Sequence, residues 1–171
     1  MINEPSSWLL ECLKSINNTR DKVALDLACG LGRHSHILAE RGFQVLAVDN
    51  DEKKLSKIAD KRITKKKVNV ENLKNWPLFF CKFDLIIVFN FLFRPIFPCI
   101  INSLNKNGFL IYETFSVGHS KFGFPKNQNY LLENEELKKF TRILSLIAYE
   151  EIMVENNINN FKKQRIFARN V

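Results

Sequence analysis

Two hydrophobic periods follow each other near the start of the chain. Residues 23–27 form a short apolar run of strand length. From Arg33 the apolar positions take the spacing of an amphipathic helix, and Gly42 occupies the usual place of a helix stop. A second apolar run, residues 43–48, then ends in Asp49. This pattern predicts a βαβ unit with two buried, parallel strands.

The rest of the chain continues the alternation of strand and helix patterns. A helix capped by Ser6 or Ser7 precedes the βαβ unit, and two long β-like runs at the end of the chain suit an antiparallel pair. We therefore predict a doubly wound α/β fold, with a mostly parallel seven-stranded sheet, a C-terminal antiparallel hairpin and helices on both faces. The further predicted strands are 68–71, 83–89, 109–115, 143–154 and 161–169, and the further helices are 8–16, 96–105 and 133–140.

Length and composition favour one globular domain over residues 1–171. The chain is 46% hydrophobic and 12% aromatic, enough for a sizeable core. No apolar run is long enough to span a bilayer, and the first residues lack the charged-then-apolar order of a signal peptide. We expect a cytoplasmic protein without a membrane partner.

Cysteine and histidine spacing predicts no metal site. Side chains at helix positions i and i+2 diverge, so His34 and His36 are interpreted as residues of a helix surface. The cysteines show no paired spacing and are predicted to be reduced thiols. They are Cys12, Cys29, Cys81 and Cys99.

The first turn of the βαβ unit has the chemistry of an adenosine-binding site. Gly30 and Gly32 allow backbone conformations and ligand contacts that a Cβ would block. Asp49, about twenty residues on, is placed to accept hydrogen bonds from a ribose diol. Asp26, inside the first strand, would repel a pyrophosphate but suits a ligand with a sulfonium and an ammonium. Ser35 stands where dinucleotide enzymes have a third glycine or alanine.

The series Asp26-x-Ala28-x-Gly30-x-Gly32 resembles motif I of class I S-adenosylmethionine (SAM) dependent methyltransferases. The resemblance runs from about residue 5 to 171 and is closest to small tellurite-resistance-type and ubiquinone-type enzymes. It implies a Rossmann-like methyltransferase fold, SAM as cofactor and in-line displacement at the methyl carbon. A dinucleotide enzyme and a ligand-free Rossmann-like domain are the alternatives. The cofactor-binding residues it implies are Asp26, Ala28, Cys29, Gly30, Gly32, Asp49, Asn50, Asn69, Val70 and Asn90.

The residues after the 83–89 strand narrow the range of possible methyl acceptors. Methyltransferases that act on an adenine amine or a glutamine amide carry Asn/Asp-Pro-Pro-Tyr/Phe there, whereas this chain has Asn-Phe-Leu-Phe at 90–93. Similar sequences have a histidine where Phe93 stands, so a proton-transfer role of that histidine is absent. No residue is assigned to catalysis, and the candidates are Arg94, His119 and Glu113.

A segment with little periodicity, residues 116–129, follows the fifth predicted strand. It contains two glycines and two phenylalanines. Structureless segments of this length are usually functional or disordered, so a lid over the methyl-donor end is one interpretation.

The net charge of +8 is concentrated between Lys53 and Lys67, where eight basic residues accompany one acid, Asp60. Residues 65–67 are expected at the start of the third strand, far from the methyl donor, so a solvated surface is favoured over an RNA-binding one. The predicted function is therefore methyl transfer to a small molecule. An RNA or protein methyltransferase and a catalytically silent SAM-binding or nucleotide-binding module are the alternatives, and the oligomeric state stays open.

Overall fold

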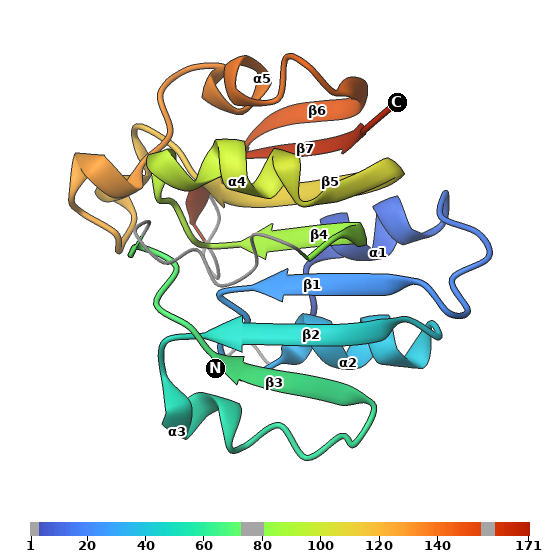
Figure 1. Ribbon diagram of the computed structural model, residues 1–171. Coiled ribbons are helices and arrows are strands. Elements are labelled where there is room, and N and C mark those ends of the chain that lie inside the picture. The colour runs from blue at the N-terminus through green and yellow to red at the C-terminus, as the bar shows by residue number, and fades with distance from the viewer. Residues whose placement is uncertain (1–3, 73–80, 155–159) are drawn as a thin grey trace.

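The computed structural model describes residues 4–72, 81–154 and 160–171, which form an α/β fold around a seven-stranded sheet (Figure 1). The strand order is β3-β2-β1-β4-β5-β7-β6. Strands β1 to β5 pair in parallel, and β7 runs antiparallel to both of its neighbours. This topology confirms the predicted sheet with its C-terminal hairpin. The strands are β1 Val23–Leu27, β2 Gln44–Asp49, β3 Ile63–Lys67, β4 Phe83–Phe89, β5 Leu104–Phe115, β6 Ser145–Val154 and β7 Phe161–Arg169.

Helices cover both faces of the sheet, because alternate residues of the buried strands point to opposite sides. Helices α1 and α2 contribute to one core cluster, with Leu9 and Leu38 against Ile111. Helices α4 and α5 contribute to the other, with Phe97 and Leu137. Figure 1 shows α4 in front of the sheet and α2 behind it. The helices are α1 Ser7–Leu13, α2 Arg33–Glu40, α3 Glu52–Leu55, α4 Phe97–Asn102 and α5 Glu136–Phe140, with 3₁₀ turns at Arg94–Ile96, His119–Lys121 and Gln128–Tyr130.

The third strand lies earlier than the sequence pattern indicated. It covers Ile63–Lys67, and the predicted 68–71 strand is instead the segment that leaves it. Val68 and Val70 are buried, whereas the last four residues of β3 are exposed at the sheet edge. The apolar residues that predicted a strand therefore belong to the segment after β3 and not to β3 itself. Because Lys67 is paired with Asp49, the basic residues reach the carboxyl end of the sheet, which corrects the expectation that they lie far from the methyl donor.

Two predicted helices are shorter in the structure. The 96–105 helix ends at Asn102, and the chain enters β5 at Leu104. Gly108 lies inside β5, where an added Cβ would come within 2.9 Å of two backbone carbonyl oxygens. The 133–140 helix begins only at Glu136. Among the described residues, none of the helices is both long and apolar enough to cross a membrane.

Candidate functional site

Three hollows open at the carboxyl ends of β1, β2 and β4, and Asp49 lines all of them. The first, of about 490 Å³, lies between the β1 turn, the start of α2 and the end of β4. The second, of about 200 Å³, lies beside residues 68–71, and the third, of about 650 Å³, beside residues 50–54 and Lys67. Ligands of doubly wound sheets bind at this edge. The hollows together form the candidate site.

The backbone at the strand tips takes an uncommon conformation. Ala28 after β1 and Asn90 after β4 have φ of 56° and 55°, in the left-handed region that side chains disfavour. Such strain concentrates at functional sites. Gly30 also has positive φ, and no atom lies within 4 Å of where its Cβ would be. An added Cβ at Gly32 would instead approach Ile58 to 2.7 Å, so Gly32 is required for packing below the site.

Asp49 is held in place by the turn that it faces. Its Oδ2 accepts a hydrogen bond from the Gly30 backbone N–H at 2.8 Å, and its Oδ1 accepts one from Asp51 at 2.9 Å. Each carboxylate oxygen has two lone pairs, so both keep acceptor capacity. The carboxylate is therefore oriented by backbone and can still accept from a ligand diol.

Asp26 is a buried acid in the wall of the same cleft. The Ser35 hydroxyl donates to its Oδ2 at 2.6 Å. Burial raises the pKa of Asp26 to about 7, although the bonds from Ser35 oppose the rise. Near neutral pH the protonated and ionised forms of this carboxyl are therefore both populated, and a cation beside it would favour the ionised form.

The smallest hollow has a mixed polar and apolar wall. Its lining includes Val70 and Phe91, with Asn69 and Glu71 at the same turn. The Asn69 Oδ1 accepts from the Glu71 backbone N–H at 3.0 Å, which fixes the amide. A flat heterocycle with an exocyclic amine would fit this combination of apolar contact and polar acceptors.

His34 lines the first hollow, although the sequence analysis placed it on a helix surface. Its Nε2 accepts a hydrogen bond from the Ser6 backbone N–H at 3.1 Å, and its ring lies 4.1 Å from the Phe89 ring. Burial, with help from the charges of Arg33 and Lys163, lowers the pKa of His34 to about 3, so the ring is neutral. The sequence carried no signal for this, because Ser6 is distant along the chain. His36 points elsewhere, with Nδ1 3.7 Å from Asp60, and the described ranges hold no cluster of three potential metal ligands.

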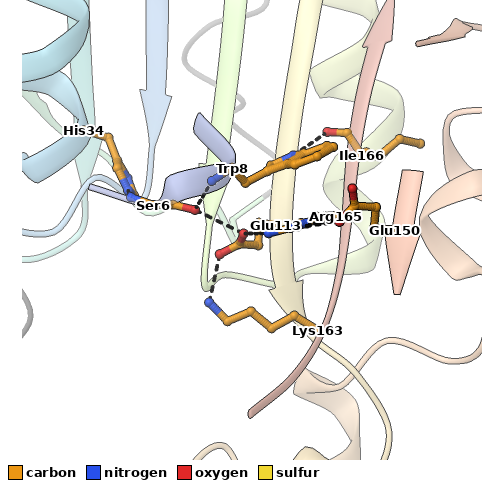
Figure 2. Close-up of polar contacts among 8 residues, drawn as sticks. All are labelled: Ser6, Trp8, His34, Glu113, Glu150, Lys163, Arg165 and Ile166. Atoms are coloured by element: carbon orange, nitrogen blue, oxygen red, sulfur yellow. Dashed lines mark hydrogen bonds and ion pairs between the residues drawn. The ribbon is translucent and has the colours of Figure 1, made fainter. Parts of the chain in front are cut away.

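Glu113 joins β5 to the start of the chain and to β7 (Figure 2). Its carboxylate accepts from the Ser6 hydroxyl at 3.1 Å and pairs with Lys163 at 2.9 Å. Arg165 lies 3.9 Å away and pairs more closely with Glu150, at 2.5 Å. Through Ser6 this network reaches His34, so Glu113 borders the cleft from behind without lining it. Helix α1 covers the sheet face here, with the Trp8 indole N–H 3.4 Å from the Ile166 carbonyl.

The other two catalytic candidates make internal contacts. Arg94 donates from Nε and Nη2 to the two carboxylate oxygens of Glu136, at 2.6 and 2.9 Å. It also donates to the carbonyls of Asn129 and Leu131. Arg94 lines a separate groove between α4 and α5 and none of the three hollows. The geometry is therefore that of a structural residue that pairs with a buried acid.

His119 also has both ring nitrogens engaged. Its Nε2 donates to the Phe124 carbonyl at 2.9 Å, and its Nδ1 accepts from the Lys162 backbone N–H at 3.3 Å. The ring is buried and stacks on Phe115 at 4.1 Å. These contacts anchor the 116–129 segment to β7, and no residue of that segment lines the three hollows.

Comparison with known proteins indicates a class of protein. Residues 24–106 match the family model described as a methyltransferase domain, and they contain the whole cleft described above except its α1 and β5 border. No curated protein matches it in sequence.

Solved methyltransferase structures share the fold at low sequence identity. TehB from Haemophilus influenzae superposes with a TM-score of 0.80 at 19% identity, over 98% of this chain and 63% of that one. A putative SAM-dependent methyltransferase from Listeria monocytogenes gives 0.71 at 14% identity, over 96% and 98% of the two chains. Magnesium protoporphyrin IX methyltransferase from Synechocystis PCC 6803, with bound SAH, gives 0.71 at 17%, over 96% and 81%. The chain thus spans 63% of the length of the Haemophilus protein.

The cleft gathers most of the predicted cofactor residues. All of them line one of the three hollows except Gly32. The sequence analysis missed further lining residues, which are Leu31, Arg33, His34, Lys54 and Phe89 in the first hollow and Val68 and Phe91 in the second.

Proposed function

We propose that this chain, as a single domain over residues 1–171, transfers the SAM methyl group to a small-molecule acceptor. The observation that carries the proposal is the position of two carboxylates in one cleft, Asp26 in its wall and Asp49 where its hollows meet. A ligand with a cationic amino-acid end and a ribose matches both.

Each part of the cleft has a proposed role. Asp49 accepts from the ribose hydroxyls, and Asp26 faces the ammonium and sulfonium end. The Asn69 amide oxygen accepts from the adenine amine, with Glu71 as the nearby alternative. Ala28, Cys29, Gly30, Asn50, Val70 and Asn90 complete the cofactor contacts as lining residues.

Alignment supplies most of the proposed rate enhancement. SAM brings an already activated methyl group on a sulfonium, so the protein needs neither a covalent nucleophile nor a strong base. Holding donor and acceptor in line can contribute effective molarities of about 10⁵ to 10⁸ M. Arg94, His119 and Glu113 all use their polar atoms on the protein itself, so none of the three candidates is assigned to catalysis.

Two observations support a small acceptor and a cytoplasmic setting. The side of the cleft bordered by Ser6 and Glu113 is closed by internal contacts of α1 and β7, which suits a small partner. All four cysteines are free thiols, as expected in a reducing compartment.

The test is calorimetry of the full chain with SAM, its demethylated product, NADH and FAD. Binding of SAM and its product, with no heat from the dinucleotides, supports the proposal. Binding of a dinucleotide alone would overturn it. A screen of small nucleophiles for release of the demethylated product then separates an enzyme from a silent SAM-binding module, for which every acceptor would fail.

A further inference from the structure

One edge of the sheet carries a concentrated positive charge. Helix α3, the segment 56–62 and strand β3 form this edge (Figure 1). Between Lys53 and Lys67 there are eight basic residues and one acid. We call the four lysines at positions 53, 57, 61 and 66 the basic edge.

The basic edge consists of the cations that the protein does not use itself. Among its neighbours, Lys54 pairs with Asp51, Lys67 with Glu52 and Arg62 with Asp60. Lys65 donates to the Ile58 carbonyl. In the described ranges the side chains of Lys53, Lys57, Lys61 and Lys66 are exposed and make no ion pair or hydrogen bond.

Protection of an open sheet edge does not account for these four lysines. Charged side chains on an edge strand discourage pairing with another strand. Lys66 lies on β3 and can serve this purpose, as can Lys65 and Lys67. Lys53 is on α3, and Lys57 and Lys61 are on the segment before the strand, so they guard no unpaired backbone.

One end of the basic edge adjoins the cofactor cleft. Lys53 lines the hollow that Lys67 and Asp49 share. Strand register places Lys66 beside the residue that precedes Asp49. Lys61 precedes the start of β3 and lies toward the other end of the sheet. The reason for setting the charge aside, a position at the far end of the sheet, therefore does not hold for Lys53 and Lys66.

The residue types of this surface indicate which kind of partner it can bind. No aromatic residue occurs between Asp49 and Lys67, so the surface offers no platform for stacking unpaired bases. The apolar residues Leu55, Ile58 and Ile63 are buried, so none is available for insertion into a lipid headgroup layer. Exposed lysines alone suit regularly spaced phosphates.

We propose that the basic edge binds the phosphate backbone of a nucleic acid duplex, next to the cofactor cleft. The interaction is independent of base sequence and is driven by counterion release, so it weakens steeply with salt. It requires no particular methyl acceptor and is independent of the function proposed above.

The experiment measures fluorescence anisotropy of the full chain with a labelled 20-base-pair RNA hairpin and a DNA duplex, at about 50 to 200 mM KCl. The test variant replaces all four lysines of the basic edge with glutamine. The matched control removes four exposed cations without partners elsewhere in the described chain, as Lys106→Gln, Lys121→Gln, Lys139→Gln and Arg142→Gln. Both variants change the net charge equally.

The basic-edge variant should weaken binding at least about tenfold at low salt and reduce the salt slope by about 0.9 for each lost phosphate contact. The control should keep the slope. Equal binding of RNA and DNA supports contact with phosphates alone, and tighter RNA binding supports contact with an A-form backbone. The proposal fails if the wild type binds neither duplex, if both variants lose affinity equally, or if phosphatidylserine vesicles bind more tightly than either duplex. An unchanged melting temperature would show that the variants are folded.

Discussion

The proposed cofactor half of the cleft, around Asp49, and its proposed acceptor half, bordered by Glu113, are built differently. In the cofactor half, the key carboxylate of Asp49 is oriented by backbone N–H groups only 2 and 19 residues away. In the acceptor half, Glu113 is held by side chains 50 and 107 residues away. Local backbone geometry leaves a pattern in the sequence, whereas long-range side-chain contacts do not. The residues of the first half could therefore be predicted one by one from the sequence, whereas those of the second half could not.

The largest effect, on the free energy of unfolding, is expected from Arg94→Ala. This substitution removes the contacts of Arg94 with Glu136, Asn129 and Leu131, which lie outside the cofactor half. The substitution leaves the Glu136 carboxylate, with a side chain only 11% exposed, without its bidentate partner. Breaking such a pair typically costs about 3 to 5 kcal/mol, and partial exposure of Arg94 places this one near the lower end. Urea denaturation should show the loss, while SAM affinity stays nearly unchanged at a temperature where the variant is folded.

Arg94→Lys is the matched control. A lysine keeps the charge but cannot reproduce the bidentate geometry or both carbonyl contacts, so it should recover only part of the stability. If Arg94→Ala were as stable as the wild type but lost acceptor turnover, Arg94 would belong to the acceptor site and the comparison above would be wrong for this residue.

The difference between local and long-range contacts also explains which site residues could be predicted from the sequence. Asp26, Gly30 and Asp49 lie together in one cleft, because strand, turn and acid keep a fixed register in a βαβ unit. His34 was missed because its partner, Ser6, belongs to another element. Arg94 was considered for the acceptor because its helix-start position is unfavourable for a cation, but Glu136 from α5 compensates.

The misplaced third strand has a different physical cause. An edge strand is solvated on both faces, so Ile63–Lys67 shows neither alternation nor an apolar run. The buried valines that follow it look more like a strand than the strand does. Only pairing with β2, a nonlocal contact, identifies the correct segment.

The next effect is expected at Asp49, in the half of the cleft that local geometry builds. Asp49→Ala should weaken SAM binding by about 1.5 to 3 kcal/mol, or roughly tenfold to hundredfold, because it removes charge-assisted hydrogen bonds to the ribose. Calorimetry measures the change, and Asp51→Ala, at a neighbouring acid that caps α3, is the control for local charge. Equal affinity in the wild type and Asp49→Ala would remove Asp49 from the ribose site.

Asp26 should make both stability and cofactor affinity depend on pH. Its pKa in the folded protein, about 7, lies above the ordinary value of 3.8, so the folded state binds the extra proton between these pH values. Stability without ligand should then fall by up to about 1.4 kcal/mol per unit as pH rises from 4 to 7. A cationic ligand favours the ionised carboxylate, so SAM affinity should rise over the same range, by up to about tenfold per unit.

Asp26→Asn isolates this contribution. The amide keeps the shape but does not titrate, so the differences in stability and SAM affinity between wild type and variant should change with pH as stated. Comparison with the wild type is required because His34, with a lowered pKa, acts oppositely. Its contribution to stability is lost as pH falls below about 6.5. A pH-independent difference between wild type and Asp26→Asn would mean that Asp26 stays ionised in the folded state.

The smallest effect is expected at His119, which tests whether the 116–129 segment belongs to the acceptor half as a catalytic element or only as an anchored loop. His119→Phe keeps a ring to stack on Phe115 but removes the bonds to the Phe124 carbonyl and the Lys162 N–H. Each lost hydrogen bond costs about 1 kcal/mol, so the unfolding free energy should fall by about 1 to 2 kcal/mol. Proteolysis should become faster within the segment, because its anchor to β7 is weakened.

SAM affinity should not change, since no residue of the segment lines the hollows. Once an acceptor is known, the turnover rate should also be retained, because neither ring nitrogen is free to take a proton. A large loss of turnover at unchanged stability would instead assign His119 as a base, and slower proteolysis in the presence of SAM would show that the segment closes over the cofactor.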